Sequence, residues 1–454
     1  MKLSDIRTAL AQLDLTPSKT LGQNFLHDQN LARWIVAQLE AGPGDALVEV
    51  GPGLGALTAA ALEIGAPLTA LEKDGRLSEF LTRRFTGQEN LRVLHGDALD
   101  FDVRALWPQR PVKVFGNLPY YVSTPLLFHF TSAAAPVEQA VFLLQRELAE
   151  RLAAGPGTKD YGLISVILGR RWRVKLLRVL PASVFLPEPK VDSALISLTL
   201  RVPGELPPCD ARTFEQIVRV GFSQRRKQLR KLLNAIGGPV LTDWPGVTAR
   251  LGVPTTVRGE ELDLQQWIAL ANEFNPVEPA AAQSASGERF DVVDEQDQVV
   301  GTETRGVVHA TGLRHRAVHL FVLNGRGELL LQKRSSWKDK HPGKWDSSAA
   351  GHVDSGEDYA HAARRELTEE LGLDPERAPL REVGALSASE ETGWEFVRVY
   401  EARHEGPFRW PAAEIEWAGF FPTETVQAWI DSHPEDFAPG FLACWRLWRA
   451  GKTA

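Results

Sequence analysis

The stretch that decides the fold of the front of the chain is LVEVGPGLGALTAAAL, residues 47–62. An apolar strand-like run leads directly into Gly51, Gly53 and Gly55, and a helix-like segment follows. Glycines in a strand-to-helix turn let the backbone approach a ligand, and the start of the helix offers unpaired N–H groups. Such a turn suits several nucleotide cofactors and also plain tight packing. It therefore predicts an α/β fold without choosing the ligand.

Three further apolar runs end in polar residues. LTALEKD (68–74) ends in Glu72, about 20 residues after the glycines, where a carboxylate can accept hydrogen bonds from both ribose hydroxyls of a cofactor. A surface Glu at a strand end gives the same pattern. LHGDALDFD (94–102) places Asp97 where it can accept a hydrogen bond from an adenine amino group, and FGNLPYYVSTP (115–125) follows the fourth run. Ligands of open α/β sheets bind outside the carboxyl ends of the strands, so these four ends predict one crevice.

The pattern along the chain predicts four segments. Short apolar runs alternate with helix-like segments in residues 1–200, which indicates a doubly wound, mostly parallel sheet in a Rossmann-like domain. Residues 201–272 have a helical pattern and are expected to form a small helical subdomain. Residues 273–288 are rich in Ala, Pro and Ser and read as a linker. Residues 289–454 are expected to form a second domain.

The composition is that of a soluble globular protein of 454 residues, 43% hydrophobic and 24% charged. The first residues lack the pattern of a secretory signal, and no apolar run is long enough to span a membrane. Cys209 and Cys444 are too far apart in sequence to suggest a disulfide framework or a zinc site. We therefore expect a cytoplasmic protein with no membrane partner, and the sequence leaves its oligomeric state open.

Charge is distributed unevenly along the chain. Residues 1–275 hold 31 Lys and Arg against 28 Asp and Glu, whereas the remainder holds 20 against 30. Two segments of the front part, GRRWRVKLLR (169–178) and SQRRKQLRKLL (223–233), contain basic residues and no acidic one. Each is either a solvated face or a nucleic-acid contact.

In family order, the motifs of residues 15–270 resemble the bacterial small-subunit rRNA adenine dimethyltransferases known as KsgA or RsmA. The matching stretches include KTLGQNFLHD, EVGPGLGALT, FGNLPYYVSTPLLF, VFLPEPKVDSALI and GFSQRRKQLRKLL. The resemblance implies S-adenosylmethionine as cofactor and dimethylation of two adjacent adenosines near the 3′ end of 16S rRNA, in the small-subunit rRNA or the pre-30S subunit. It also implies the cofactor-binding residues Asn24, Leu26, Gly51, Gly53, Glu72, Asp97 and Asn117.

The chemistry of FGNLPYYVSTP fits methylation of an exocyclic amine. If the Asn117 side-chain oxygen and the carbonyl of Leu118 or Pro119 accept the two N–H bonds, the nitrogen can pyramidalise and aim its lone pair at the methyl group. Tyr120 and Phe185 are candidates to stack on a base taken out of its helix, with a core position as the alternative for Phe185. Tyr121 is expected to be a packing residue.

Structured RNA is recognised through shape and phosphate contacts. Within the second basic segment we therefore expect contacts to the RNA backbone from four residues: Arg225, Arg226, Lys227 and Arg230.

Residues 351–373, GHVDSGEDYAHAARRELTEELGL, satisfy the whole Nudix pattern. On a helix, Glu366, Glu369 and Glu370 share one face. Clustered carboxylates repel one another unless a cation neutralises them, so this pattern favours a Mg²⁺ or Mn²⁺ site over a solvated acidic helix. Resemblance to the Nudix family makes these three glutamates metal ligands, with Gly351 lending its carbonyl. It also gives Glu369 and Glu370 a catalytic role and leaves Arg365 to orient the carboxylates. The resemblance implies an α/β/α fold. Helix start and stop signals predict a helix at about 358–371, ended by Gly372.

The residues before this motif, 313–353, resemble isopentenyl-diphosphate isomerases and the isomerase-like Nudix hydrolases. Isomerases carry a catalytic Cys where this chain has Ala350, so hydrolysis of a nucleoside or isoprenoid diphosphate is favoured over isomerisation. Five basic side chains are candidates for phosphate contacts, although each singly could be a surface charge: Arg314, Arg316, Lys333, Arg334 and Lys340.

Three alternatives stay open. The front domain can be a large-subunit rRNA methyltransferase of the macrolide-resistance type, or an RNA-binding ribosome assembly factor. The back domain can be an isopentenyl-diphosphate isomerase.

Overall fold

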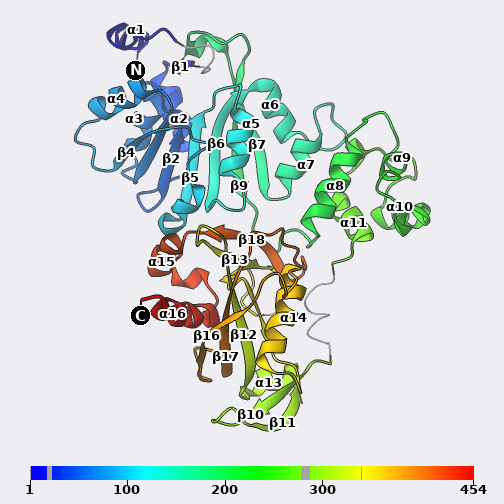
Figure 1. Cartoon of the computed structure of the whole chain (residues 1–454). Helices are drawn as coiled ribbons and strands as arrows, with labels where there is room; N and C mark the ends of the chain where they lie inside the picture. The colour runs from blue at the N-terminus through cyan, green and yellow to red at the C-terminus, as the bar shows by residue number, and fades with distance from the viewer. Residues whose placement is uncertain (1, 18–22, 278–286, 339, 454) are drawn as a thin grey trace. The chain divides into compact units, whose positions relative to one another are not determined.

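The computed structural model describes residues 2–17, 23–277, 287–338 and 340–453 (Figure 1). The chain divides into two compact units, which are described separately. The first comprises Met1–Val202, Ile217–Gly237 and Gly252–Gln266, and the second comprises Pro203–Gln216, Gly238–Leu251 and Trp267–Ala454. The stretch KTLG of the first family motif lies outside the described residues, as does the greater part of the predicted linker. No described helix has the length and apolar character needed to cross a membrane.

The first unit is built on a seven-stranded sheet with the order β4-β3-β2-β5-β6-β9-β7. Neighbours from β4 to β6 are parallel, and β9 pairs antiparallel with both β6 and β7. This arrangement confirms the predicted doubly wound, mostly parallel sheet. The strands are β2 (Ala46–Val50), β3 (Leu68–Glu72), β4 (Leu91–His95), β5 (Val112–Asn117), β6 (Val137–Gln145), β7 (Trp172–Leu180) and β9 (Ser193–Leu200).

Helices cover both faces of this sheet because alternate side chains of each strand point to opposite sides. Leu47 packs in the cluster that contains α2 and α3, whereas Val48 packs in the cluster that contains α5, α6 and α7. The helices of the unit up to residue 169 are α1 (Leu3–Gln12), α2 (Gln29–Ala37), α3 (Ala56–Leu62), α4 (Gly75–Arg84), α5 (Ser123–Phe130), α6 (Arg146–Ala153) and α7 (Leu163–Gly169). A short antiparallel pair joins β1 (Phe25–Leu26) to β8 (Phe185–Leu186).

Residues 201–272 are helical, as their pattern predicts. The helices are α8 (Ala211–Gly221), α9 (Leu229–Leu233), α10 (Trp244–Leu251) and α11 (Leu264–Phe274). The basic segment 223–233 is not one continuous helix, because a turn over residues 222–228 separates α8 from α9. Parts of the region fall in each of the two compact units, so its standing as a separate subdomain stays a prediction.

The second unit contains a mixed seven-stranded sheet. Its main path is β14-β13-β12-β17-β16, β15 pairs with β12, and β18 pairs with β13. The strands are β12 (His315–Leu323), β13 (Leu329–Arg334), β14 (Trp345–Asp346), β15 (Ala349–His352), β16 (Arg381–Leu386), β17 (Glu395–Arg403) and β18 (Ile415–Phe421). A separate hairpin of β10 (Arg289–Val293) and β11 (Val299–Thr304) precedes the sheet. The helices are α13 (Arg305–Thr311), α14 (Tyr359–Leu371), α15 (Thr423–Ser432) and α16 (Pro439–Thr453).

Helix α14 begins and ends at the residues that the sequence indicates. The side chain of Asp358 caps it by accepting a hydrogen bond from the His361 N–H. Gly372 ends it with a φ of 65°, the left-handed conformation that glycine adopts without strain. Apolar residues of α14 pack on β12 in one cluster, which fixes the acidic face of the helix relative to the sheet.

Candidate active sites

The first site is a cavity of about 110 Å³ at the carboxyl ends of β2 and β5. These two strands are neighbours in the sheet. From β2 the chain continues to β3 and β4 on one side, and from β5 it continues to β6 on the other. Ligands of doubly wound sheets bind at such a switch point. The turn after β2 carries Gly51 and Gly53, both with positive φ, which glycine tolerates best. All residues predicted to bind the cofactor line this one cavity: Asn24, Leu26, Gly51, Gly53, Glu72, Asp97 and Asn117.

Glu72 is held rigidly at the end of β3. Its carboxylate accepts hydrogen bonds from the backbone N–H of Gly53 and of Asp74, each at 2.9 Å. Burial raises the pKa of Glu72, and the two N–H donors counteract that rise. The side chain is 6% exposed, so it lies in the wall of the cavity and is not a surface Glu.

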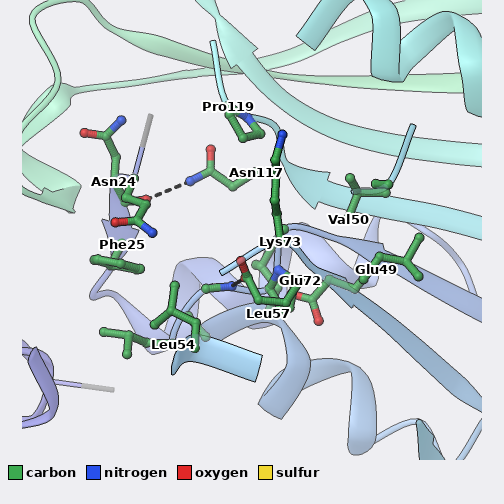
Figure 2. Close-up of a pocket in the computed structure, with 18 of the residues that line it drawn as sticks. Asn24, Phe25, Glu49, Val50, Leu54, Leu57, Glu72, Lys73, Asn117 and Pro119 are labelled. Atoms are coloured by element: carbon green, nitrogen blue, oxygen red, sulfur yellow. Dashed lines mark hydrogen bonds between the residues drawn. The ribbon is translucent and has the colours of Figure 1, made fainter. Parts of the chain in front are cut away.

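Asp97 follows β4 and is paired with a residue that the sequence did not single out. Lys73 Nζ lies 2.6 Å from Asp97 Oδ2, and the Leu99 N–H donates to Oδ1 at 3.0 Å. The hydrogen bond from Lys73 lowers the pKa of Asp97, so this carboxylate is ionised and can accept further hydrogen bonds. Lys73 also lines the cavity (Figure 2).

Asn117 ends β5, and its side chain has a fixed orientation. The Nδ2 group donates to the backbone carbonyl of Asn24 at 2.9 Å (Figure 2). A carbonyl only accepts, so this bond turns the Oδ1 atom of Asn117 away from Asn24. Pro119 lies beside it in the cavity lining. An amide oxygen at this place can accept a hydrogen bond from a substrate amine.

The three aromatic candidates lie in different environments. The Tyr120 hydroxyl is 2.6 Å from Ser193 Oγ, and burial raises the pKa of Tyr120. Tyr121 is 57% exposed and lines the cavity, so the expectation of a packing residue was wrong. Phe185 is 2% exposed within the core cluster of α2 and α3, where it pairs with Leu26 across β1 and β8. This burial is the environment that the core alternative expects, and the stacking role of Phe185 stays a prediction.

Two cavity features escaped sequence reasoning. Gly116 in β5 runs so close to β2 that an added Cβ would lie 2.3 Å from the Val50 carbonyl oxygen. Glu49 in β2 is 1% exposed and accepts a hydrogen bond from Thr58 Oγ1 at 2.6 Å. Burial raises the pKa of Glu49 to about 8. The acid-before-glycine pattern of EVGPG was the only available signal for Glu49.

The four predicted RNA-binding residues are all exposed. Arg225 also has contacts within the fold. Its Nε is 2.7 Å from Glu260 Oε2, and its guanidinium also donates to the carbonyls of Thr158 and Lys159. The contact of these four residues with RNA stays a prediction.

The second site lies in the second unit, in a cavity of about 500 Å³ lined by Glu366, Glu369 and Glu370 of α14. Arg365 orders this acidic face. Its Nη1 is 2.7 Å from Glu366 Oε1 and 3.2 Å from Glu369 Oε2, while Nε and Nη2 donate to Glu357. Its Nη2 also donates to the His352 carbonyl at 2.8 Å. Arg365 therefore contacts both the carboxylates and the strand that faces them.

The glutamates are poised for a cation. Burial raises the pKa of Glu366 to about 7, and burial together with the charge of Glu366 raises the pKa of Glu370. Glu370 forms a side-chain hydrogen bond with Glu414, a fourth acidic residue that precedes β18 and was not predicted. Lys338 Nζ lies 2.9 Å from Glu414 Oε2. Clustered buried carboxylates of this kind are stabilised by a divalent metal ion, which fits the donor set that hard cations require.

Gly351 lies against the acidic face, as the motif requires. A Cβ at this position would lie 1.9 Å from Glu366 Oε1, so only glycine leaves the carboxylate in place. The preceding Ala350 lines the cavity, pairs with His319 across β15 and β12, and donates its N–H to Glu370 Oε2 at 2.9 Å. Ala350 therefore lines the cavity at the position of the isomerase Cys and has no thiol.

A histidine cluster at one end of this cavity was missed. His309, His315 and His352 offer ring nitrogens within 4.8 Å of one another. Glu395 Oε1 is 3.5 Å from His315 Nε2 and 3.3 Å from His352 Nε2. Among the described residues, the Nε2 atom of His309 is buried without a hydrogen-bond partner. Imidazole nitrogens gathered beside a carboxylate fit a divalent transition metal or zinc.

The candidate phosphate contacts do not all reach the cavity. Arg334 and Lys340 line it, together with Lys338. Arg314 pairs with Glu295, Arg316 with Asp297, and Lys333 with Glu416. None of these three basic residues lines the cavity, so the surface-charge alternative describes them better.

The doubly wound sheet with its cofactor-type cavity defines the first part as a Rossmann-like methyltransferase. Residues 16–275 match the ribosomal RNA adenine dimethylase family, and the chain belongs to that family. Residues 313–441 match the NUDIX domain, so the protein also carries a Nudix unit.

Relatives and a solved structure are similar to the first part of the chain. A ribosomal RNA small subunit methyltransferase A from Pseudomonas putida is 42% identical over 260 residues, which cover 56% of this chain and 94% of the relative. The protein of that name from Xanthomonas axonopodis is 42% identical over 254 residues, covering 56% and 95%. The crystal structure of a dimethyladenosine transferase from Plasmodium falciparum is 24% identical with a TM-score of 0.47, covering 55% of this chain and 97% of that one.

Proposed function

We propose that the first part of the protein uses S-adenosylmethionine to dimethylate N6 of two adjacent adenosines near the 3′ end of small-subunit 16S rRNA, in the pre-30S subunit. The observation that carries the proposal is the Asn117 side chain, oriented by its hydrogen bond to Asn24 at the switch point of the sheet. The relatives named small subunit methyltransferase A support the choice of small-subunit over large-subunit rRNA.

In this proposal the residues that line the first cavity have separate roles in binding the cofactor. The Glu72 carboxylate holds the ribose of the cofactor, Asp97 holds its adenine, and the Gly51–Gly53 turn contacts it through the backbone. Asn24 and Leu26 border it on the side of β1. When bound, S-adenosylmethionine supplies the methyl group that is transferred.

Asn117 Oδ1, with the carbonyl of Leu118 or Pro119, accepts the two N–H bonds of the target amine. The amine then directs its lone pair at the methyl group without a strong base, so positioning and electrostatics provide most of the rate enhancement. We assign stacking on the extruded adenine to Tyr120, with the exposed Tyr121 as a second aromatic contact.

RNA binding is assigned to Arg226, Lys227 and Arg230, with Arg225 holding the turn that presents them. We also propose the domain division 1–200, 201–272 and 289–454, joined by the linker 273–288, and a cytoplasmic location, where a ribosomal RNA substrate would be found.

Methyl transfer from labelled S-adenosylmethionine tests this activity. The full chain is expected to label protein-free or ribosome-bound small-subunit rRNA, and Asn117→Ala is expected to lower the rate by about 100-fold or more while cofactor binding largely persists. Labelling of large-subunit rRNA instead would establish the macrolide-resistance alternative. RNA binding with no labelling would leave the assembly-factor alternative.

We propose that the second part is a Mg²⁺- or Mn²⁺-dependent Nudix hydrolase of a nucleoside or isoprenoid diphosphate. Glu366, Glu369 and Glu370 would hold the metal, Gly351 would lend its carbonyl, and Arg334, Lys338 and Lys340 would contact substrate phosphates. The metal supplies charge neutralisation and an acidified water. Glu369 and Glu370 are the candidates to take a proton from water. The histidine cluster is a separate candidate metal position.

A hydrolysis screen of the full chain with Mg²⁺ or Mn²⁺ across nucleoside and isoprenoid diphosphates tests this proposal. Phosphate release that is lost in Glu366→Gln and kept in Asn117→Ala is expected. Formation of the isomer from isopentenyl diphosphate would establish the isomerase alternative, and the absence of any metal-dependent turnover would contradict the hydrolase assignment.

A further inference from the structure

Strand β7 carries the greater part of the first basic segment, Gly169–Arg178, to which neither proposed activity assigns a role. Among the described strands it is an edge strand of the first sheet, with β9 as its neighbour. Arg173, Lys175 and Arg178 are exposed on it. No acidic residue occurs between Gly169 and Pro187 in the sequence. The strand therefore presents positive charge at an edge of the sheet.

A bulge keeps these three side chains on one face. Arg173 pairs with Thr199 and Lys175 with Ser197, after which the register shifts so that Arg178 pairs with Leu195. Alternate residues of a strand share a face, so Thr199, Ser197 and Leu195 of β9 point to the same side. A regular strand would have placed Arg178 on the opposite side, where it would follow Leu176. The extra residue, Leu177, thus aligns Arg173, Lys175 and Arg178 in a basic row.

The basic row lies on the face of the sheet that α2 covers. Leu195 and Leu180 of this face belong to the core cluster of α2 and α3, whereas Trp172 and Ile196 belong to the cluster on the other face. The Arg178 guanidinium lies 5.5 Å from the ring centroid of Trp34 on α2. The row therefore begins beside α2 and continues along β7, where its side chains are exposed.

The same face leads to the methyl-transfer site. Leu180, two residues beyond Arg178, pairs with Ser193, which also pairs with Gln145 at the carboxyl end of β6. Ser193 Oγ is the atom that contacts the Tyr120 hydroxyl at 2.6 Å. At about 3.3 Å per residue, the row extends roughly 15 Å from Arg178 to Arg173, away from the edge where Tyr120 lies.

We propose that the basic row of β7 binds the phosphate backbone of the ribosomal RNA substrate and guides the strand that enters the site beside Tyr120. The proposal rests on the proposed methylation of rRNA. A polyanion is the occupant that three exposed cations, aligned on one face of a strand, would attract most strongly. Phosphate contacts of this kind fix register and orientation, whereas the cavity selects the base.

The test compares two charge reversals in the full chain. Lys175→Glu/Arg178→Glu is expected to weaken binding of protein-free small-subunit rRNA by about 10-fold or more at physiological salt. It is also expected to reduce the slope of log K against log salt by about 1 to 2. S-adenosylmethionine affinity and the unfolding temperature should stay at the wild-type value. The matched control is Arg83→Glu/Arg92→Glu, which reverses two exposed residues of α4 and of β4, the opposite edge strand.

RNA binding by the β7 variant with wild-type affinity and salt slope would overturn the proposal and leave a solvated face or a docking edge for a protein. Equal weakening by the control variant would overturn it as well, because net charge alone would then explain the effect. Methylation of small-subunit rRNA by the wild-type chain is measured in parallel. Its absence refutes the proposed function, whereas its presence with unaltered binding by the variant refutes only the role of β7.

Discussion

Glu49 is a buried acid in the wall of the cofactor cavity, and its ionisation links stability to pH. Its pKa is about 8 in the folded protein, against an ordinary value of 4.5. The folded state therefore retains a proton that the unfolded chain releases. The stability this gives is complete below about pH 4.5 and is lost as the pH rises through 8.

Replacement of Glu49 tests this linkage. Between pH 5 and 8 the free energy of unfolding of the first unit should fall by up to about 1.4 kcal/mol per pH unit in the wild type, and by less in Glu49→Gln. Urea unfolding at pH 5, 7 and 9, followed by a signal from the first unit, measures both slopes. Parallel pH profiles for the two proteins would contradict the assignment.

Gly351 must lack a side chain for the Glu366 carboxylate to keep its position. In Gly351→Ala the new methyl group would overlap the Glu366 carboxylate, and the carboxylate must move. We expect the affinity for Mn²⁺, measured by titration calorimetry, to fall about 10- to 100-fold, because carboxylate position decides metal affinity. The control is Gly301→Ala on β11, where an added Cβ meets nothing within 4 Å. Equal Mn²⁺ affinity in both variants would show that Glu366 is not a ligand.

Individual site residues could be predicted where fold rules fix their place. Glu72 and Asn117 end strands of a parallel sheet and Asp97 closely follows one, and the carboxyl ends of such strands meet at one edge of the sheet. The ion pair of Arg225 could not be predicted, because its partner Glu260 is 35 residues away in the sequence and only the packed structure brings the two together. The burial of Phe185 depends in the same way on the pairing of β8 with β1.

Two neighbouring arginines of the turn between α8 and α9 are both exposed. Arg225 connects this turn to Glu260 and to the loop at residues 158–159, and Arg226 is the arginine that we expect to serve RNA binding alone. The hydrogen bonds to fixed carbonyls make the Arg225 network worth more than an isolated surface ion pair, which contributes about 0–1 kcal/mol.

Arg225→Glu and Arg226→Glu should therefore behave differently. We expect Arg225→Glu to lower the unfolding temperature by a few degrees, through loss of about 1–2 kcal/mol, and Arg226→Glu to leave it unchanged while weakening RNA binding. Thermal unfolding and an RNA-binding titration measure the two effects. The exchange Arg225→Glu/Glu260→Arg should recover part of the stability, and failure of Arg225→Glu to destabilise would refute the anchoring role.

Regular elements were predictable and irregular ones were not. Helix α14 carries its own signals, Asp358 before it and Gly372 after it, so its bounds follow from local chemistry. The bulge at Leu177 has no such signal, because a strand with one extra residue has the same apolar character as a regular strand. The histidine cluster was also hidden, since its members come from α13, β12 and β15.

For the whole molecule, complete motifs made both families recognisable from sequence, and the structure adds the pairing of residues within each site. The Nudix pattern has fixed spacing on one helix, and the methyltransferase motifs follow four successive strand ends. The family of the first unit is established, and its site is the more complete of the two.

Mass mapping of N6,N6-dimethyladenosine in ribosomal RNA tests most directly whether the first unit dimethylates small-subunit rRNA through Asn117. Three strains of the source organism are compared: one carries the wild-type gene, one lacks it, and one carries Asn117→Ala. We expect two adjacent dimethyladenosines near the 3′ end of the small-subunit rRNA in the first strain and none in the other two. The same small-subunit rRNA in all three strains would refute this activity.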